Sequence, residues 1–243
     1  MPKIDKSQYT KEQWKKLKLE RKKIKERNRQ IKESNGADNN TENTKLESQD
    51  VAFVIGNGTS RSSIDLPQLK ENGKTYACNA VYRTFNPDYL VAVDVKMVLE
   101  INKAGYQHKN EVWTNPNRSY QRMQNLNYFN PSKGWSSGPT SLWLAAQHGY
   151  KTIYILGFDY RGLNDGTTFN NIYADTANYK KSTDGATFFG NWSRQTQAVI
   201  KNFSKINFVR VINKDSYIPQ EFSKFDNLEH ITVEEFKKSF EIL

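Results

Sequence analysis

The stretch Val51-Ala-Phe-Val-Ile-Gly-Asn-Gly-Thr-Ser60 decides the fold of this chain. Its first five residues are apolar, and such a run predicts a strand of a parallel sheet that is buried on both faces. The run ends at Gly56-Asn57-Gly58 and passes into small hydroxyl residues that end at Ser60. A glycine turn at the carboxyl end of a strand exposes N–H groups where α/β folds bind phosphates. We therefore expect a nucleotide site here, with an ordinary strand-to-helix turn as the alternative.

The two glycines, Gly56 and Gly58, are expected to let the backbone turn tightly and approach a ligand closely. Arg61 occupies the place of the third glycine of the dinucleotide fingerprint. The motif therefore speaks against a standard NAD site but agrees with a mononucleotide site.

From Val51 onward, short apolar runs alternate with helical segments. We expect strands at 51–55, 75–78, 89–93, 111–114, 152–156 and 208–212. We expect helices at 95–103, 138–148, 192–205 and 233–240. This alternation predicts a Rossmann-like, mostly parallel α/β sheet with helices on both faces. The segments 115–135, 161–191 and the tail after Asn213 interrupt the alternation, and the first two are expected to be lids or binding loops.

The basic charge of the chain is concentrated at its N-terminus. Residues 1–33 carry 13 Lys/Arg and 5 Asp/Glu, and so +8 of the net charge of +10. We expect a basic helical arm at 1–33, a flexible linker at 34–50 and the Rossmann-like domain at 51–243. We expect the arm to be a solvated helix or, alternatively, to bind nucleic acid, an acidic membrane surface or a partner protein. The sequence leaves the oligomeric state of the protein open.

Several function classes lack their sequence signatures. One cysteine excludes an intramolecular disulfide, and no Asp-x-Asp pair, P-loop or Gly-x-Ser-x-Gly elbow is present. The histidines have no metal-ligand spacing, so no metal site is predicted. No signal peptide and no apolar run of about 20 residues is present. We expect a soluble protein that is cytoplasmic or packaged in a virion.

Polar residues at the predicted strand ends and at one helix start are the candidates for chemistry. Asp94 and Asp159 end two predicted strands. We expect each of them to bind a ribose, to orient a substrate or to act as a base, with a helix cap or turn as the alternative. Ser137 and Gly138 open the helix at 138–148, whose free N–H groups form an anion site or an ordinary capped start. Tyr173 and Tyr179 lie in the aromatic-rich loop, where they bind phosphate or fix the loop.

Several motifs occur in one order along residues 51–215. They are Gly56-Asn57-Gly58-Thr59-Ser60, Ile64-Asp65, Cys78-Asn79-Ala80-Val81-Tyr82, Ser137-Gly138, Gly149-Tyr150-Lys151-Thr152-Ile153-Tyr154 and Gly157-Phe158-Asp159-Tyr160. This order resembles the bacterial lipooligosaccharide sialyltransferases, which use a CMP-sialic acid donor. The resemblance implies a Rossmann-like glycosyltransferase-type domain at 51–243, a CMP-sugar donor and no required cofactor or metal.

The resemblance also implies roles for individual residues. Asn57 and Ser60 would lie near the cytidine phosphate, Asn79 near the nucleotide, and Ser137 with Gly138 at the donor-binding helix. The tyrosines that help the phosphate leave would be Tyr173 and Tyr179.

One departure concerns the base of the reaction. The family has a catalytic histidine in a Gly-His element, whereas this chain has Gly190-Asn191. An asparagine does not take up a proton as imidazole does. Asp184 or another carboxylate replaces the histidine, or the domain binds without catalysing, so the sequence leaves enzyme activity open.

Two weaker resemblances complete the sequence evidence. Pro87-Asp88 and the following residues to Asp94 resemble motility-accessory and pterin-diphosphokinase-like domains, and the Asn/Lys/Tyr-rich composition resembles bacteriophage proteins. The leading hypothesis is a nucleotide- or nucleotide-sugar-binding glycosyltransferase. The alternative is a non-catalytic structural or interaction protein, such as a virion component, that uses the fold as a scaffold and the basic arm for partners.

Overall fold

The apolar run Val51–Ile55 forms β1, a central strand of an eight-stranded sheet. The strand order is β5-β4-β3-β2-β1-β6-β7-β8, and every neighbouring pair is parallel. The computed structural model describes residues 50–242 together with Leu19 and Lys22. The predicted arm at 1–33 and the linker at 34–50 lie outside the described residues except at these positions, and both stay predictions.

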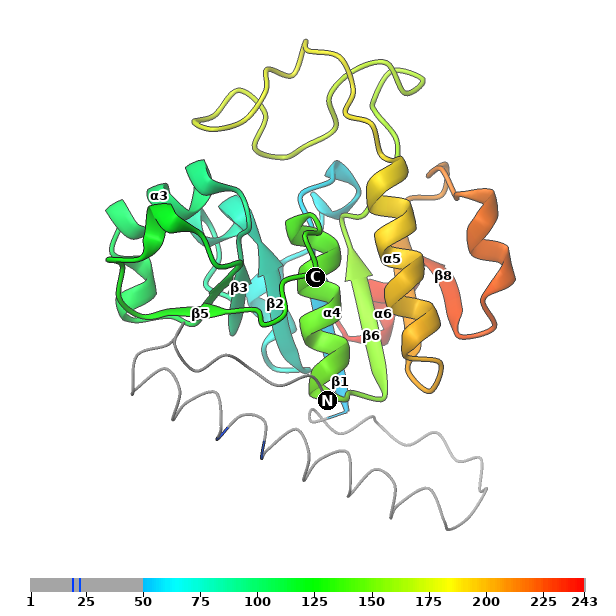
Figure 1. Cartoon of the computed structure of the whole chain (residues 1–243). Coiled ribbons are helices and arrows are strands. Elements are labelled where there is room, and N and C mark those ends of the chain that lie inside the picture. The colour runs from blue at the N-terminus through cyan, green and yellow to red at the C-terminus, as the bar shows by residue number, and fades with distance from the viewer. Residues whose placement is uncertain (1–18, 20–21, 23–49, 243) are drawn as a thin grey trace.

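Helices connect most of the parallel strands (Figure 1). The other strands are β2 (Lys74–Cys78), β3 (Tyr89–Val91), β4 (Val112–Thr114), β5 (Leu126–Tyr128), β6 (Thr152–Leu156), β7 (Asn207–Ile212) and β8 (Leu228–Thr232). The α-helices are α2 (Leu66–Leu69), α3 (Val95–Lys103), α4 (Ser137–His148), α5 (Gly190–Asn202) and α6 (Val233–Ser239). Short 3-10 helices are η2 (Thr59–Arg61), η3 (Asn79–Arg83), η4 (Tyr106–His108), η5 (Arg118–Tyr120) and η6 (Gln220–Lys224).

The sheet has an apolar layer on each face because successive residues of a strand point to opposite sides. In β1, Phe53 and its odd-numbered neighbours pack with α2, α3 and α6. The even-numbered Ala52 and Val54 pack with α4 and α5. All five residues of β1 are fully buried, as expected for a strand covered on both faces. The prediction of a Rossmann-like parallel α/β sheet is therefore confirmed.

The expected helices and strands are all present, with ends that shift by up to three residues. Two strands were missed. The segment 115–135 contains η5 and β5, and the tail after Asn213 contains β8, so neither is an interruption of the α/β pattern. Both strands lie at sheet edges, where burial is incomplete and polar residues are tolerated, so no apolar run marks them. The segment 161–189 is a long loop without a named helix or strand, as expected.

The strand order places a topological switch point beside β1. From β1 the chain continues toward β2 on one side, whereas β6 pairs with β1 on the other side. Open α/β sheets bind ligands at the carboxyl ends of strands at such a point. The glycine turn after β1 and the loop 161–189, yellow at the top of Figure 1, lie at this edge.

Candidate functional site

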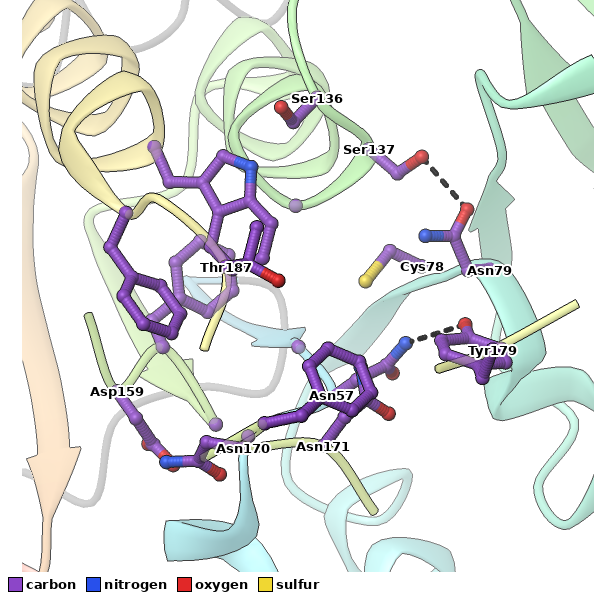
Figure 2. A pocket seen from close by; sticks show the side chains of 18 of the residues that line it. Asn57, Cys78, Asn79, Ser136, Ser137, Asp159, Asn170, Asn171, Tyr179 and Thr187 are labelled. Carbon is purple, nitrogen blue, oxygen red and sulfur yellow. Dashed lines mark hydrogen bonds between the residues drawn. The ribbon is translucent and has the colours of Figure 1, made fainter. Parts of the chain in front are cut away.

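A cavity of about 460 Å³ lies at the carboxyl edge of the central strands. Figure 2 shows residues around it from the turns after β1 and β6, from the end of β2, from the start of α4 and from the loop 161–189. The predicted site residues among its lining are Gly56, Asn57, Gly58, Asn79, Asp94, Ser137, Gly138, Asp159 and Tyr179. Residues from strand ends far apart in the sequence thus meet at one place, because the strands are parallel.

The glycine turn is packed directly against the turn that follows β6. The backbone N–H of Gly58 donates to the carbonyl oxygen of Gly157 at 2.9 Å. A Cβ on Gly58 would lie 2.5 Å from the carboxyl carbon of Asp159, and a Cβ on Gly56 would lie 2.6 Å from the oxygen of Gly157. No larger residue fits at these two positions without displacing a neighbour. The glycines therefore serve close packing between the two turns at the cavity wall.

Asp159 holds the glycine turn in place. Its Oδ2 accepts hydrogen bonds from the backbone N–H of Ser60 at 3.1 Å and from Nδ2 of Asn170 at 3.0 Å, and its Oδ1 accepts from the Ser60 hydroxyl. Asn170 in turn accepts from both the N–H and the hydroxyl of Thr59. Ser60 is buried and does not line the cavity. Its hydrogen bonds therefore orient Asp159 and the turn.

The start of α4 supplies the second wall. The Ser137 hydroxyl donates to Oδ1 of Asn79 at 2.8 Å and accepts from the N–H of Val93 at 3.1 Å. Asn79 adopts a left-handed conformation with φ of 53°, which is uncommon for residues other than glycine. This conformation at the end of β2 brings the Asn79 amide against the helix start (Figure 2). Free N–H groups of a helix start attract anions, so this wall suits a phosphate group.

The loop 161–189 closes over the glycine turn through Asn57. Nδ2 of Asn57 donates to the Tyr179 hydroxyl at 3.0 Å, and the Asn57 carbonyl oxygen accepts from the N–H of Ile172 at 2.8 Å. Oδ1 of Asn57 is buried and has no hydrogen-bond partner among the described residues. A buried acceptor without a partner costs free energy, and the amide nitrogen and the backbone carbonyl of Asn57 hold it against the loop.

Two buried arginines lie behind the cavity wall. Arg61 donates from Nε to the Gly56 carbonyl oxygen, and Arg210 of β7 donates to the carbonyl oxygens of Phe158 and Asp159. Neither arginine forms an ion pair with a carboxylate in the described part of the chain. Desolvation lowers the pKa of Arg210, because burial disfavours the charged form. Buried positive charge near the turns favours an anionic ligand in the adjacent cavity.

Asp94 is the other carboxylate of the cavity. It is the N-cap residue of α3, yet its side chain accepts no hydrogen bond from the helix. The residue is exposed at the cavity wall, and partial desolvation raises the pKa of its carboxyl above the usual value. Capping, the alternative that the sequence left open for Asp94, is therefore not observed.

Two other ionisable groups of the cavity are held neutral by burial. Desolvation raises the pKa of the Cys78 thiol to about 12. Desolvation also raises the pKa of Tyr179, whose hydroxyl accepts from the N–H of Ala80. Tyr179 therefore keeps its proton and is available as a hydrogen-bond donor at neutral pH.

Three predicted site residues lie outside the cavity. Ser60 has the positioning role described above. Tyr173 is buried, with its hydroxyl 2.9 Å from Oγ1 of Thr84 and its ring 5.9 Å from that of Tyr179. Asn191 is exposed in the first turn of α5 and accepts from Arg194 at 2.7 Å. The structure thus brings Tyr173 to the cavity indirectly, through Tyr179, and leaves Asn191 pointing to another partner.

Sequence reasoning expected a binding loop here but missed most of the loop residues that line the cavity. They are Phe169, Asn170, Asn171, Lys180 and Thr187. No periodicity marks them, because an irregular loop is held by individual hydrogen bonds. The asparagine pair at 170–171 is the one available signal, since asparagine favours turns and offers an amide to ligands.

The described residues contain no group of three or more His, Cys, Asp or Glu that is arranged to hold a metal ion. None of the helices in this part of the chain is long and apolar enough to cross a membrane.

Comparison with known proteins gives matches in structure and none in sequence. No protein-family model and no curated protein matches the chain. The monofunctional α-2,3-sialyltransferase Cst-I of Campylobacter jejuni matches with a TM-score of 0.50 and 16% identity, covering 78% of this chain and 84% of that chain. The sialyltransferase CstII of the same organism, in complex with the substrate analogue CMP-3FNeuAc, matches with a TM-score of 0.45 and 15% identity. This match covers 69% of this chain and 83% of that chain.

The match to Cst-I shows the fold alone. This chain has a Rossmann-like parallel α/β fold, with a cavity at the switch point of the sheet. The weaker resemblances to pterin-diphosphokinase-like domains and to bacteriophage proteins stay predictions.

Proposed function

We propose that this protein is a glycosyltransferase that binds a nucleotide sugar, with a CMP-sugar as the donor, in the cavity beside β1. The observation that carries the proposal is the convergence of the glycine turn, the start of α4 and the loop 161–189 on one cavity at the switch point. This is the place where open α/β sheets bind nucleotides. The fold shared with the sialyltransferase Cst-I supports the same reading.

The phosphate would lie between the start of α4 and the Tyr179 hydroxyl. The helix N–H groups and the buried Arg61 and Arg210 favour its negative charge. The protonated Tyr179 and the cation Lys180, both at the cavity wall, would stabilise the charge that develops on the departing phosphate.

A CMP-sugar fits this set of groups because its leaving group is a monophosphate. A diphosphate leaving group carries more charge and is commonly neutralised by a divalent metal on paired carboxylates. The cavity offers hydrogen-bond donors and one lysine at its wall. The resemblance to the lipooligosaccharide sialyltransferases points to the same donor class.

The test is a thermal-shift screen of the full chain against CMP, CDP, UDP, GDP, ADP and CMP-N-acetylneuraminic acid. A ligand that binds the folded state alone stabilises it by about 2.7 kcal/mol at a hundredfold excess over its Kd. We expect CMP and its sugar to raise the Tm. Gly58→Ala should abolish the shift, because the new Cβ would lie 2.5 Å from the Asp159 carboxyl carbon.

Gly185→Ala is the matched control for this screen. A Cβ at Gly185 meets no atom within 4 Å, so the variant should keep the ligand shift. A wild-type chain that responds to no nucleotide would contradict the proposal and favour the scaffold alternative.

A further inference from the structure

The proposed transfer needs a base. The hydroxyl oxygen of an acceptor sugar must bond to the anomeric carbon of the donor, and its proton must go to a nearby group. No histidine lines the cavity in the described part of the chain. His148, the last residue of α4, is buried against the Tyr76 hydroxyl, and His230 lies on β8. The base must therefore be a residue other than histidine.

Three ionisable candidates are excluded by their surroundings. Both carboxylate oxygens of Asp159 already accept hydrogen bonds from Ser60 or Asn170. Asp184 lies outside the cavity, where it accepts from the N–H of Lys181 at 2.9 Å. The Cys78 thiol stays protonated because burial raises its pKa to about 12.

Asp94 differs from these groups because its carboxylate is free. It lines the cavity at the carboxyl end of β3, and no hydrogen bond or ion pair to its side chain exists among the described residues. An aspartate at an N-cap normally accepts a hydrogen bond from its own helix. Because the Asp94 carboxylate does not cap α3, its oxygens are free to take a proton at the cavity wall.

We propose that Asp94 is the general base of the transfer and takes the proton of the acceptor hydroxyl. This inference rests on the proposed function. As the acceptor oxygen forms its bond to the anomeric carbon, its proton passes to a carboxylate oxygen of Asp94. The bond between the anomeric carbon and the phosphate oxygen breaks, and its electron pair leaves with the CMP phosphate.

The environment of Asp94 supports this role. Desolvation raises the pKa of its carboxyl, which makes the carboxylate a stronger base. The titratable groups that interact with it are Cys78 of β2 and Tyr120 of η5, both with raised pKa values. Neither of them titrates in the acid range. Asp159 is the other carboxylate of the same cavity. Tyr179 and Lys180 of the loop 161–189 also line this cavity.

The experiment compares Asp94→Asn with the wild-type full chain. The donor probes are CMP-N-acetylneuraminic acid, UDP-galactose and GDP-mannose, and release of the nucleotide is measured with water and with methyl β-galactoside as acceptors. We expect kcat to fall by about 10²- to 10⁴-fold, the usual contribution of a general base. Donor affinity should change by less than about threefold. The acid limb of the wild-type pH–rate profile should be absent in the variant.

The isosteric Asp94→Asn should fold as the wild type does, since its carboxylate makes no hydrogen bond. The control is Asp226→Asn. Asp226 is exposed in the turn before β8, so this variant should keep full turnover.

Four other results would contradict the role of Asp94 or the proposed function. A kcat of Asp94→Asn within about twofold of the wild type, or a loss that lies wholly in donor affinity, would show that Asp94 is not the base. A large loss in Asp184→Asn instead would assign the base elsewhere. A wild-type chain that binds CMP but turns over no donor would overturn this inference and leave nucleotide binding intact. A chain that binds no nucleotide would overturn the proposed function itself.

Discussion

At the scale of single residues, the shape of the site depends on Asp159. Its carboxylate accepts from Ser60 and Asn170, and it occupies the space that a side chain on Gly58 would need. A charged acceptor of several hydrogen bonds stabilises a turn more than a neutral one does. The aspartate that follows β6 thus fixes the geometry of the neighbouring glycine turn, and both of its oxygens accept hydrogen bonds there.

We expect Asp159→Asn to destabilise the protein. An asparagine keeps one acceptor oxygen, but its amide group would face the N–H of Ser60 and the amide of Asn170. The loss should be about 1–3 kcal/mol of the free energy of unfolding. Chemical denaturation measures it, with the exposed Asp65→Asn as the control. An unchanged stability together with lost turnover would instead identify Asp159 as a catalytic residue.

The residues that sequence analysis brought to the cavity are those that follow a strand or open a helix. Gly58 and Asp94 were found because parallel strands end at one edge, and Ser137 because it opens a helix, whereas Asn79 was placed by the family resemblance. Tyr173 and Asn191 were placed by their order in a resembling family. Their surroundings depend on how an irregular segment packs, and periodicity carries no information about that.

At the scale of elements, the loop 161–189 is hydrogen-bonded to both partners of an ion pair that joins η3 to α3. Arg83 donates from Nε and Nη2 to both carboxylate oxygens of Glu100, at 2.8 and 2.6 Å. The same guanidinium donates to the Thr176 hydroxyl and the Ala177 carbonyl oxygen. Nδ2 of Asn178 also donates to Glu100 at 2.6 Å. The loop segment that carries Tyr179 is therefore positioned by a bidentate pair outside the cavity.

We expect Glu100→Gln to loosen this part of the loop. Hydrogen bonds from Arg83 lower the pKa of the Glu100 carboxyl from 4.5 to about 2. A lowered pKa means that the stabilisation is complete above pH 4.5 and is lost as the pH falls toward 2. The free energies of unfolding of wild type and variant should therefore differ by about 2 kcal/mol at neutral pH and converge in acid.

Hydrogen exchange provides the second measurement for Glu100→Gln. The amides of Asp175 and Tyr179, which bond within the loop, should exchange faster in the variant. Equal exchange at both amides, or a stability difference independent of pH, would show that the ion pair does not position the loop.

The elements that could be predicted are those with a strong apolar period. β1, β6 and β7 are interior strands with long apolar runs, and α4 begins with serine and proline and ends at Gly149. The two edge strands escaped because β5 has three residues and β8 mixes charged and apolar side chains. An edge strand is stabilised by pairing with its neighbour more than by its own composition.

At the scale of the whole molecule, the C-terminal helix closes one face of the central sheet. Phe236 of α6 is fully buried, and its ring centroid lies 6.0 Å from that of Phe53 on β1 and 5.4 Å from that of Tyr154 on β6. Phe240 lies 5.1 Å from Phe236 in the same cluster. The strands that carry the glycine turn and Asp159 thus depend on the last described helix for their covering layer.

We expect Phe236→Ala to lower stability without changing the site. Removing a buried phenylalanine costs about 3–5 kcal/mol, because the cavity left behind does not fully collapse. For a domain of this size the Tm should fall by about 10 °C. Scanning calorimetry measures the change, with Phe188→Ala as the control, since Phe188 is 76% exposed.

Nucleotide affinity measured well below the Tm should match the wild type, because no α6 residue lines the cavity. A small Tm shift would mean that α6 is not needed to cover the sheet, and a loss of affinity would mean that it also shapes the site.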